Sequence, residues 1–126
     1  MPDIKILLCD DSLLVRKKMK GALAELGYTD LLEASDGEEA VTLCKSHKPD
    51  LVLLDIVMPK KDGLEALSEI KQADPSIHVV MVSSIGTQSK LMQAIKLGAD
   101  NFLQKPVTVD AVVGIVQKII NKRGGR

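Results

Sequence analysis

Five polar residues that could carry out phosphoryl or metal chemistry stand at the ends of short apolar segments of this sequence. They are Asp10 and Asp11 after residues 4–9, Asp55 at the end of residues 51–55, Ser83 at the end of residues 78–83, and Lys105 after residues 101–104. Two carboxylates ~4 Å apart repel each other by about 4 kcal/mol at an effective dielectric of about 20. A bound cation or raised pKa values would relieve that repulsion, so the three aspartates predict a cation site.

Magnesium is the cation that this set of oxygen atoms fits best. It binds through carboxylates together with phosphate oxygens and retains several waters, whereas zinc prefers nitrogen and sulfur ligands. Lys105 would pair with a phosphoryl oxygen, or with Asp55 when that oxygen is absent. The hydroxyl of Ser83 could donate to the same phosphoryl group.

Taken singly, each of these residues has an ordinary structural explanation. An aspartate after a strand is most often a turn former or a helix cap. The acidic pair could be favourable charge at a helix N-terminus, the serine a buried hydroxyl, and the lysine a solvated loop residue. Their joint position at the ends of successive apolar segments favours one shared site.

Five strand-length apolar segments alternate with five segments of helical periodicity. The expected strands are residues 4–9, 31–34, 51–55, 78–83 and 101–104. The expected helices are residues 13–26, capped by Ser12 and followed by Gly27, and then residues 37–47, 64–73, 88–97 and 109–122. This alternation predicts a parallel sheet with helices on both faces, because parallel neighbours need crossover connections. Ligands of such folds bind beyond the carboxyl ends of the strands, where the polar residues stand.

Composition limits the function further. The chain has 126 residues, of which 45% are apolar and 27% charged, as expected of one domain with a buried core. Seventeen basic and seventeen acidic residues cancel, so we expect no direct binding of nucleic acid. No apolar stretch approaches the ~20 residues that span a bilayer, and the N-terminus lacks a signal-peptide pattern. We therefore expect a cytoplasmic protein without membrane insertion.

The remaining reactive or aromatic residues are assigned no chemistry. Cys9 and Cys44 are too few for a disulfide framework or a zinc site, so we expect both to be buried as small apolar residues. Tyr28, His47 and His78 fall at element boundaries and are expected at the surface.

Four motifs of the sequence resemble those of a known family. They are LLCDDS, LLDIVMPKKDG, VVMVSS and LGADNFLQKP, in this order. Together they resemble the receiver domain of two-component response regulators, and within it the stand-alone chemotaxis type, the CheY-like proteins. The resemblance implies a flavodoxin-like, doubly wound five-stranded parallel sheet with strand order 2-1-3-4-5. It extends from Ile4 to about Lys122, so we expect a receiver domain over residues 1–122 and a flexible basic tail over residues 123–126.

The resemblance also implies roles for individual residues at the phosphorylation site. Asp55 would accept a phosphoryl group from a histidine kinase or a small phosphodonor. Asp11, Asp55 and the backbone carbonyl of Val57 would bind Mg²⁺, for which Mn²⁺ could substitute, and Asp10 would act through a water molecule. Lys105 would pair with the phosphoryl group.

Further roles concern the switch and the lifetime of the phosphoryl group. Ser83 and Phe102 take the places of the switch hydroxyl and the switch aromatic, although core packing is the alternative for Phe102. Pro106 is a candidate for a cis peptide bond after Lys105. Val57 and Ile85 are apolar where many relatives carry polar groups, so we expect them to slow hydrolysis.

The implied partners follow from this assignment. They are a sensor histidine kinase or histidine phosphotransfer protein, a downstream target bound at the face formed by residues 88–97, 101–104 and 109–122, and a phosphatase. We expect a monomer, with a phosphorylation-linked dimer as the alternative. Such a switch promotes its own phosphorylation and dephosphorylation without being a turnover enzyme.

Several alternatives stay open at the level of the sequence. The chain could be a receiver cut from a multidomain transcriptional regulator, or a phosphorelay intermediate. A magnesium phosphotransferase of the haloacid dehalogenase type is more remote, because its nucleophile usually lies on the first strand and a general acid follows two residues later. A flavodoxin-like cofactor binder is more remote still, because only 2% of the residues are aromatic.

Overall fold

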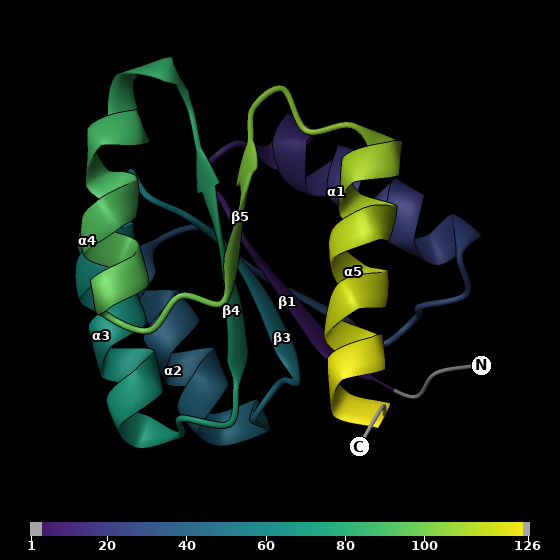
Figure 1. Ribbon diagram of the computed structural model, residues 1–126, viewed down its shortest axis with the longest axis horizontal. Coiled ribbons are helices and arrows are strands. Elements are labelled where there is room, and N and C mark those ends of the chain that lie inside the picture. The colour runs from purple at the N-terminus through teal and green to yellow at the C-terminus, as the bar shows by residue number, and fades with distance from the viewer. Residues whose placement is uncertain (1–3, 125–126) are drawn as a thin grey trace.

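The computed structural model describes residues 4–124, except for the side chains of Ile85 and of residues 122–124. Five parallel strands form one sheet in the order β2-β1-β3-β4-β5 (Figure 1). The strands are β1 (Ile6–Cys9), β2 (Leu31–Ala34), β3 (Leu51–Asp55), β4 (His78–Ser83) and β5 (Asn101–Gln104). The helices are α1 (Leu13–Glu25), α2 (Gly37–His47), α3 (Gly63–Ala73), α4 (Leu91–Lys96) and α5 (Val109–Gly124), with a 3₁₀ helix, η1 (Ile85–Lys90), before α4. The predicted doubly wound sheet and its strand order are confirmed.

The sheet separates two apolar cores. β1 and β3 are buried throughout their length, because helices cover both faces of the sheet. α2, α3 and α4 lie on one face, and α1 and α5 lie on the other (Figure 1). Neighbouring side chains of one strand alternate between the two cores, with Leu53 on the α1–α5 side and Leu54 on the opposite side. Residues at the ends of these strands are therefore carried by rigid, buried elements.

The end of α1 buries a tyrosine that the sequence placed at the surface. Gly27 has a φ of 93° and donates its N–H to Ala24 O at 3.0 Å, while the N–H of Tyr28 bonds to Leu23 O at 3.0 Å. This pair of hydrogen bonds is a Schellman motif, in which the residue after the glycine folds back onto the helix. Tyr28 consequently packs in the same core as Leu23 and is only 6% exposed. The predicted cap Ser12 is confirmed, because its Oγ accepts the N–H of Val15 at 3.3 Å.

The fourth helical segment differs most from its prediction. Instead of one helix over residues 88–97, η1 precedes a short α4. The side chain of Thr87 accepts the N–H of Ser84 at 2.9 Å and donates to the Ser84 carbonyl at 3.1 Å. These local bonds favour a tight turn, and Gly86 weakens the α-helical alternative. At the other end of the chain α5 continues to Gly124, into the expected tail, and residues 125–126 lie outside the described part.

Both cysteines are buried free thiols, as expected. Burial raises the pKa of the Cys9 thiol well above its usual value, and burial also raises the pKa of Cys44 to about 12. Both side chains are therefore protonated and unreactive at neutral pH.

A partly buried ionic cluster holds the end of α3 against the start of β4. Asp100 accepts the N–H of Val79 at 2.8 Å and the ammonium of Lys71 at 3.0 Å. Lys71 also donates to the carbonyl of Ile77 at 2.7 Å. His78, which was expected at the surface, is only partly exposed, with Nδ1 3.6 Å from Oδ1 of Asp100. Burial of Asp100 raises its pKa, but the hydrogen bonds from Val79 and Lys71 outweigh burial and hold that pKa below its usual value.

We expect Asp100→Asn to lower the free energy of unfolding by about 1–2 kcal/mol at pH 7, because it removes two charge-assisted hydrogen bonds. A lowered carboxyl pKa stabilises the fold above the unfolded-state value of about 3.9, and this contribution is lost as the pH falls through the folded-state pKa. The deficit of the variant should therefore shrink below pH ~4. Urea unfolding of the native chain and of Asp100→Asn at pH 7 and at pH 3.5 measures this deficit. A deficit that is independent of pH would assign the loss to packing, and the exposed Asp30→Asn is the control.

Candidate functional site

The sheet register brings the strand-end residues to one edge. β1 and β3 pair with Cys9 opposite Leu54, so the next residues, Asp10 and Asp55, lie side by side. β4 and β5 pair with Ser83 opposite Gln104, which places Lys105 next to the end of β4. The amide of Lys105 also donates to the carbonyl of Ser83 at 2.7 Å.

Three carboxylates converge at this edge. One oxygen of each of Asp10, Asp11 and Asp55 lies within 4.8 Å of the others. Asp10 and Asp55 are 1% and 6% exposed, whereas Asp11 is exposed to solvent. Oxygen atoms at such spacing are the ligands that magnesium prefers, and the exposed Asp11 leaves the cluster open to solvent on one side.

Lys105 bridges the two buried carboxylates. Its ammonium lies 2.9 Å from Asp10 Oδ2 and 2.9 Å from Asp55 Oδ2. Burial lowers the pKa of Lys105, but the hydrogen bonds that it donates to Asp55 and Asp10 outweigh burial and raise that pKa. Burial raises the pKa of Asp55, as does the charge of Asp10, and the opposing effect of Lys105 does not fully cancel the increase. In the described part of the site, three carboxylates share one ammonium, which contacts only two of them.

Backbone amides hold the remaining carboxylate oxygens. Asp10 Oδ1 accepts the N–H of Ser12 at 2.8 Å, and Asp55 Oδ1 accepts the N–H of Val57 at 3.2 Å. The connection after β3 then returns sharply, because Gly63 donates its N–H to the carbonyl of Ile56 at 2.6 Å. These bonds fix the two buried carboxylates in the orientation that faces Lys105.

The other residues singled out in the sequence surround this cluster or lie near it. Ser83 is fully buried, and its hydroxyl has no hydrogen-bond partner within the described part of the chain. Val57 is 53% exposed at the rim, and the Lys105–Pro106 peptide bond is cis. The side chain of Ile85 lies outside the described part of the structure.

Phe102 does not lie in an apolar core. Its side chain is 46% exposed on β5, so core packing is the wrong explanation for the only phenylalanine of the chain. The ring is therefore not enclosed by core side chains.

Two charged residues near the site were missed in the sequence. Arg16 of α1 donates Nη1 to the backbone carbonyl of Asp10 at 2.5 Å and Nε to Glu33 Oε1 at 2.9 Å. Glu33 is the single charged residue of the strand segment LLEA, and a charge in so short a strand indicates a partner on a neighbouring helix. The identity of that partner depends on tertiary packing.

The model of the response regulator receiver domain matches residues 6–117 of this sequence. The chain belongs to the response regulator receiver domain family. The receiver site described above, with its acidic pocket of Asp10, Asp11 and Asp55, lies within the matched range. Receivers are phosphoacceptor switch proteins rather than turnover enzymes, which sets aside the phosphotransferase and the flavodoxin-like cofactor binder.

Individual relatives agree with this assignment. The chemotaxis protein CheY of Bacillus subtilis is 41% identical over 117 residues, which are 93% of this chain and 98% of that relative. The chemotaxis protein CheY of Halobacterium salinarum is 40% identical over 92% of this chain and 96% of its own length. Among solved structures, the receiver domain of AraT, a response regulator from Geobacillus stearothermophilus, superposes with a TM-score of 0.90 at 28% identity, covering 97% of this chain and 96% of that one. In the described residues no helix is both long and apolar enough to cross a membrane.

Proposed function

We propose that Asp55 accepts a phosphoryl group from the phosphohistidine of a sensor histidine kinase or of a histidine phosphotransfer protein. The observation that carries this proposal is the placement of Asp55 at the end of a buried strand, 2.9 Å from the ammonium of Lys105 and beside two further carboxylates. A carboxylate nucleophile needs no general base, so the site has to supply positioning and neutralisation of charge. A rigid strand positions the nucleophile better than a mobile loop would.

The donor set fits a magnesium ion. We propose Asp11, Asp55 and the backbone carbonyl of Val57 as its protein ligands, with Asp10 acting through a water molecule and Mn²⁺ as a substitute. The excess of carboxylates over lysine and the open side at Asp11 support this assignment. When bound, the ion would neutralise negative charge on the transferring phosphoryl oxygens.

The residues of the chain account for the other parts of the transfer. An oxygen of Asp55 attacks phosphorus, the phosphorus–nitrogen bond breaks, and the leaving imidazole keeps the bonding pair and takes up a proton. The ammonium of Lys105 binds a carboxylate oxygen of Asp55 before the transfer and can bind a phosphoryl oxygen from the same position afterwards. The unpartnered hydroxyl of Ser83 can donate to another phosphoryl oxygen.

The same hydroxyl connects the site to a binding surface. If Ser83 moves toward a phosphoryl group, it vacates space into which the ring of Phe102 can turn. The surface formed by α4, β5 and α5 also exposes apolar side chains, among them those of Met92, Ile95 and Val109. We propose this surface as the docking site of a downstream protein, in a chemotaxis pathway because two relatives are named chemotaxis proteins.

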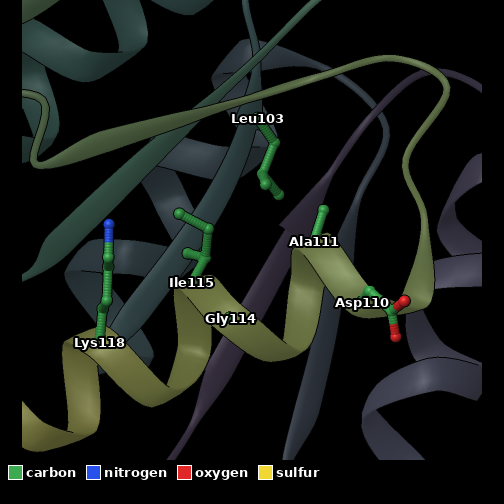
Figure 2. Close-up of a pocket in the computed structure, with 6 residues that line it drawn as sticks. All are labelled: Leu103, Asp110, Ala111, Gly114, Ile115 and Lys118. Carbon is green, nitrogen blue, oxygen red and sulfur yellow. The ribbon is translucent and has the colours of Figure 1, made fainter.

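A hollow between β5 and α5 forms part of this surface. Its volume is about 300 Å³, and it is lined by Leu103, Asp110, Ala111, Gly114, Ile115 and Lys118. Figure 2 shows Leu103 and Ile115 pointing toward each other near Gly114, with Asp110 and Lys118 toward its two ends. An apolar side chain of the target would fit between these two charges.

Incubation with acetyl phosphate and magnesium tests the phosphoacceptor. We expect one phosphoryl mass per chain in the native protein and loss of most of it in Asp55→Asn, measured by intact-protein mass spectrometry. Asp110→Asn, an exposed carboxylate on α5, is the matched control and should be labelled normally. Undiminished labelling of Asp55→Asn would reject Asp55 as the acceptor.

Val57 is expected to prolong the life of the phosphoryl group. Its β-branched side chain at the rim is stiff and has no group that orients water for attack on phosphorus. We expect Val57→Asn to speed the loss of phosphate by ~10-fold, or about 1.4 kcal/mol of barrier, after the donor has been removed. Equal or longer lifetimes in the variant would show that another feature controls hydrolysis.

A further inference from the structure

Arg16 joins three elements at the turn that carries the acidic pair. It lies on α1, its side chain is 13% exposed, and it donates Nη1 to the Asp10 carbonyl at 2.5 Å and Nε to Glu33 of β2 at 2.9 Å. Lys20, one turn further along α1, binds the other oxygen of Glu33 at 3.0 Å. The guanidinium contacts the backbone of the acidic pair through the Asp10 carbonyl.

This contact fixes the peptide plane between Asp10 and Asp11. The carbonyl of Asp10 and the amide of Asp11 belong to one planar unit, so orienting the carbonyl orients the bond that leads to Asp11. The other side of Asp10 is already held, because its N–H donates to the carbonyl of Ala34 at 3.1 Å. The exposed Asp11 carboxylate consequently takes its direction from a backbone held by β2 and by Arg16.

Glu33 keeps the guanidinium at this carbonyl. Arg16 is a cation that contacts the backbone of Asp10, and without an anionic partner its charge would oppose the binding of a metal ion beside it. Hydrogen bonds from Lys20 and Arg16 hold the pKa of Glu33 below its usual range, so Glu33 is anionic at neutral pH. The planar guanidinium can bind Glu33 and the carbonyl at the same time, which the single ammonium of a lysine does poorly.

We propose that Arg16 is a positioning residue for metal binding, which aims Asp11 into the carboxylate cluster by fixing the Asp10–Asp11 peptide. This inference rests on the proposed magnesium site. The inference gives α1 and β2 a part in metal affinity, although neither Arg16 nor Glu33 belongs to the carboxylate cluster.

The sign of the effect on metal affinity separates positioning from simple electrostatics. Removing a positive charge near a cation site should strengthen cation binding if charge alone matters. If Arg16 positions Asp11, Arg16→Gln should instead weaken Mg²⁺ binding by about 10-fold, the usual size of effects from groups that orient metal ligands. Isothermal titration calorimetry on the full chain below its melting temperature measures the dissociation constant directly.

Two further variants complete the test. Lys20→Gln removes the same charge from the same helix and the same Glu33 network but does not touch Asp10, so it should leave Mg²⁺ affinity unchanged or slightly raised. Arg16→Lys keeps the charge but cannot bind Glu33 and the Asp10 carbonyl equally well at the same time. We therefore expect Mg²⁺ affinity to fall by about 3-fold. If Arg16→Gln does not fold, the comparison of Arg16→Lys with Lys20→Gln decides the result.

Labelling by acetyl phosphate gives an independent measure. In Arg16→Gln the Mg²⁺ concentration for half-maximal labelling should rise by about 10-fold, while the rate at saturating Mg²⁺ stays within about 2-fold of the native rate. A fall in the saturating rate alone would show a structural role and overturn the inference. Native-like Mg²⁺ affinity in both Arg16 variants would overturn it and leave the proposed function intact, whereas a native chain that does not bind Mg²⁺ would overturn both.

Discussion

Gly63→Ala is expected to lower the free energy of unfolding by about 3 kcal/mol, because there is no room for a methyl group at this position. An added Cβ would lie 2.2 Å from the backbone oxygen of Asp55 and 2.6 Å from the Cα of Ile56. These are backbone atoms, so relief of the clash requires the connection after β3 to move away from α3. The same movement would displace Asp55, and we expect slower labelling by acetyl phosphate as well.

Gly21→Ala is the matched control for this prediction. Gly21 also lies in a helix, but an added Cβ would meet nothing within 4 Å, so the alanine should stabilise the chain by up to about 1 kcal/mol through helix propensity. Urea unfolding of the two variants should therefore give changes of opposite sign. A neutral effect of Gly63→Ala would show that the connection after β3 relaxes easily and does not hold Asp55 rigidly.

Lys105→Met is expected to lower the free energy of unfolding by about 3 kcal/mol in the absence of magnesium. The change leaves Asp10 and Asp55 facing each other without their cation, and breaking a buried ion pair at one partner typically costs this much. Added Mg²⁺ should stabilise the variant more than the native chain, because the ammonium no longer offsets the negative charge of the cluster.

Urea unfolding with and without Mg²⁺ measures both effects of this substitution. The exposed Lys118→Met is the control and should change stability by less than about 0.5 kcal/mol. A loss below about 1 kcal/mol for Lys105→Met would mean that solvent stabilises the two carboxylates as well as the ammonium does.

The sequence was sufficient to predict the sheet and the cluster of strand-end residues. β1, β3 and β4 were recognisable because a strand covered on both faces is apolar throughout, and parallel order then places Asp10, Asp55 and Lys105 at one edge. The pattern could not predict η1, since the bonds between Ser84 and Thr87 compete with an α-helix whose periodicity is otherwise present.

Residues whose position depends on tertiary packing were also missed. Tyr28 follows a helix-ending glycine, which suggests exposure, but the Schellman motif folds it back into the core. Arg16 and Glu33 are ordinary charged residues in the sequence, and only the packing of α1 on β2 brings them to the Asp10 carbonyl.

The burial of Tyr28 determines how this protein can be observed optically. It is the only tyrosine and the chain has no tryptophan, so intrinsic fluorescence comes from one ring in the core beneath α1 and α5. That ring precedes β2 and thus lies toward the amino-terminal edge of the sheet, whereas Asp55 stands at the carboxyl edge. Ultraviolet emission consequently reports the packing of one core during unfolding, while occupancy of the acidic pocket needs calorimetry, mass spectrometry or an introduced fluorophore.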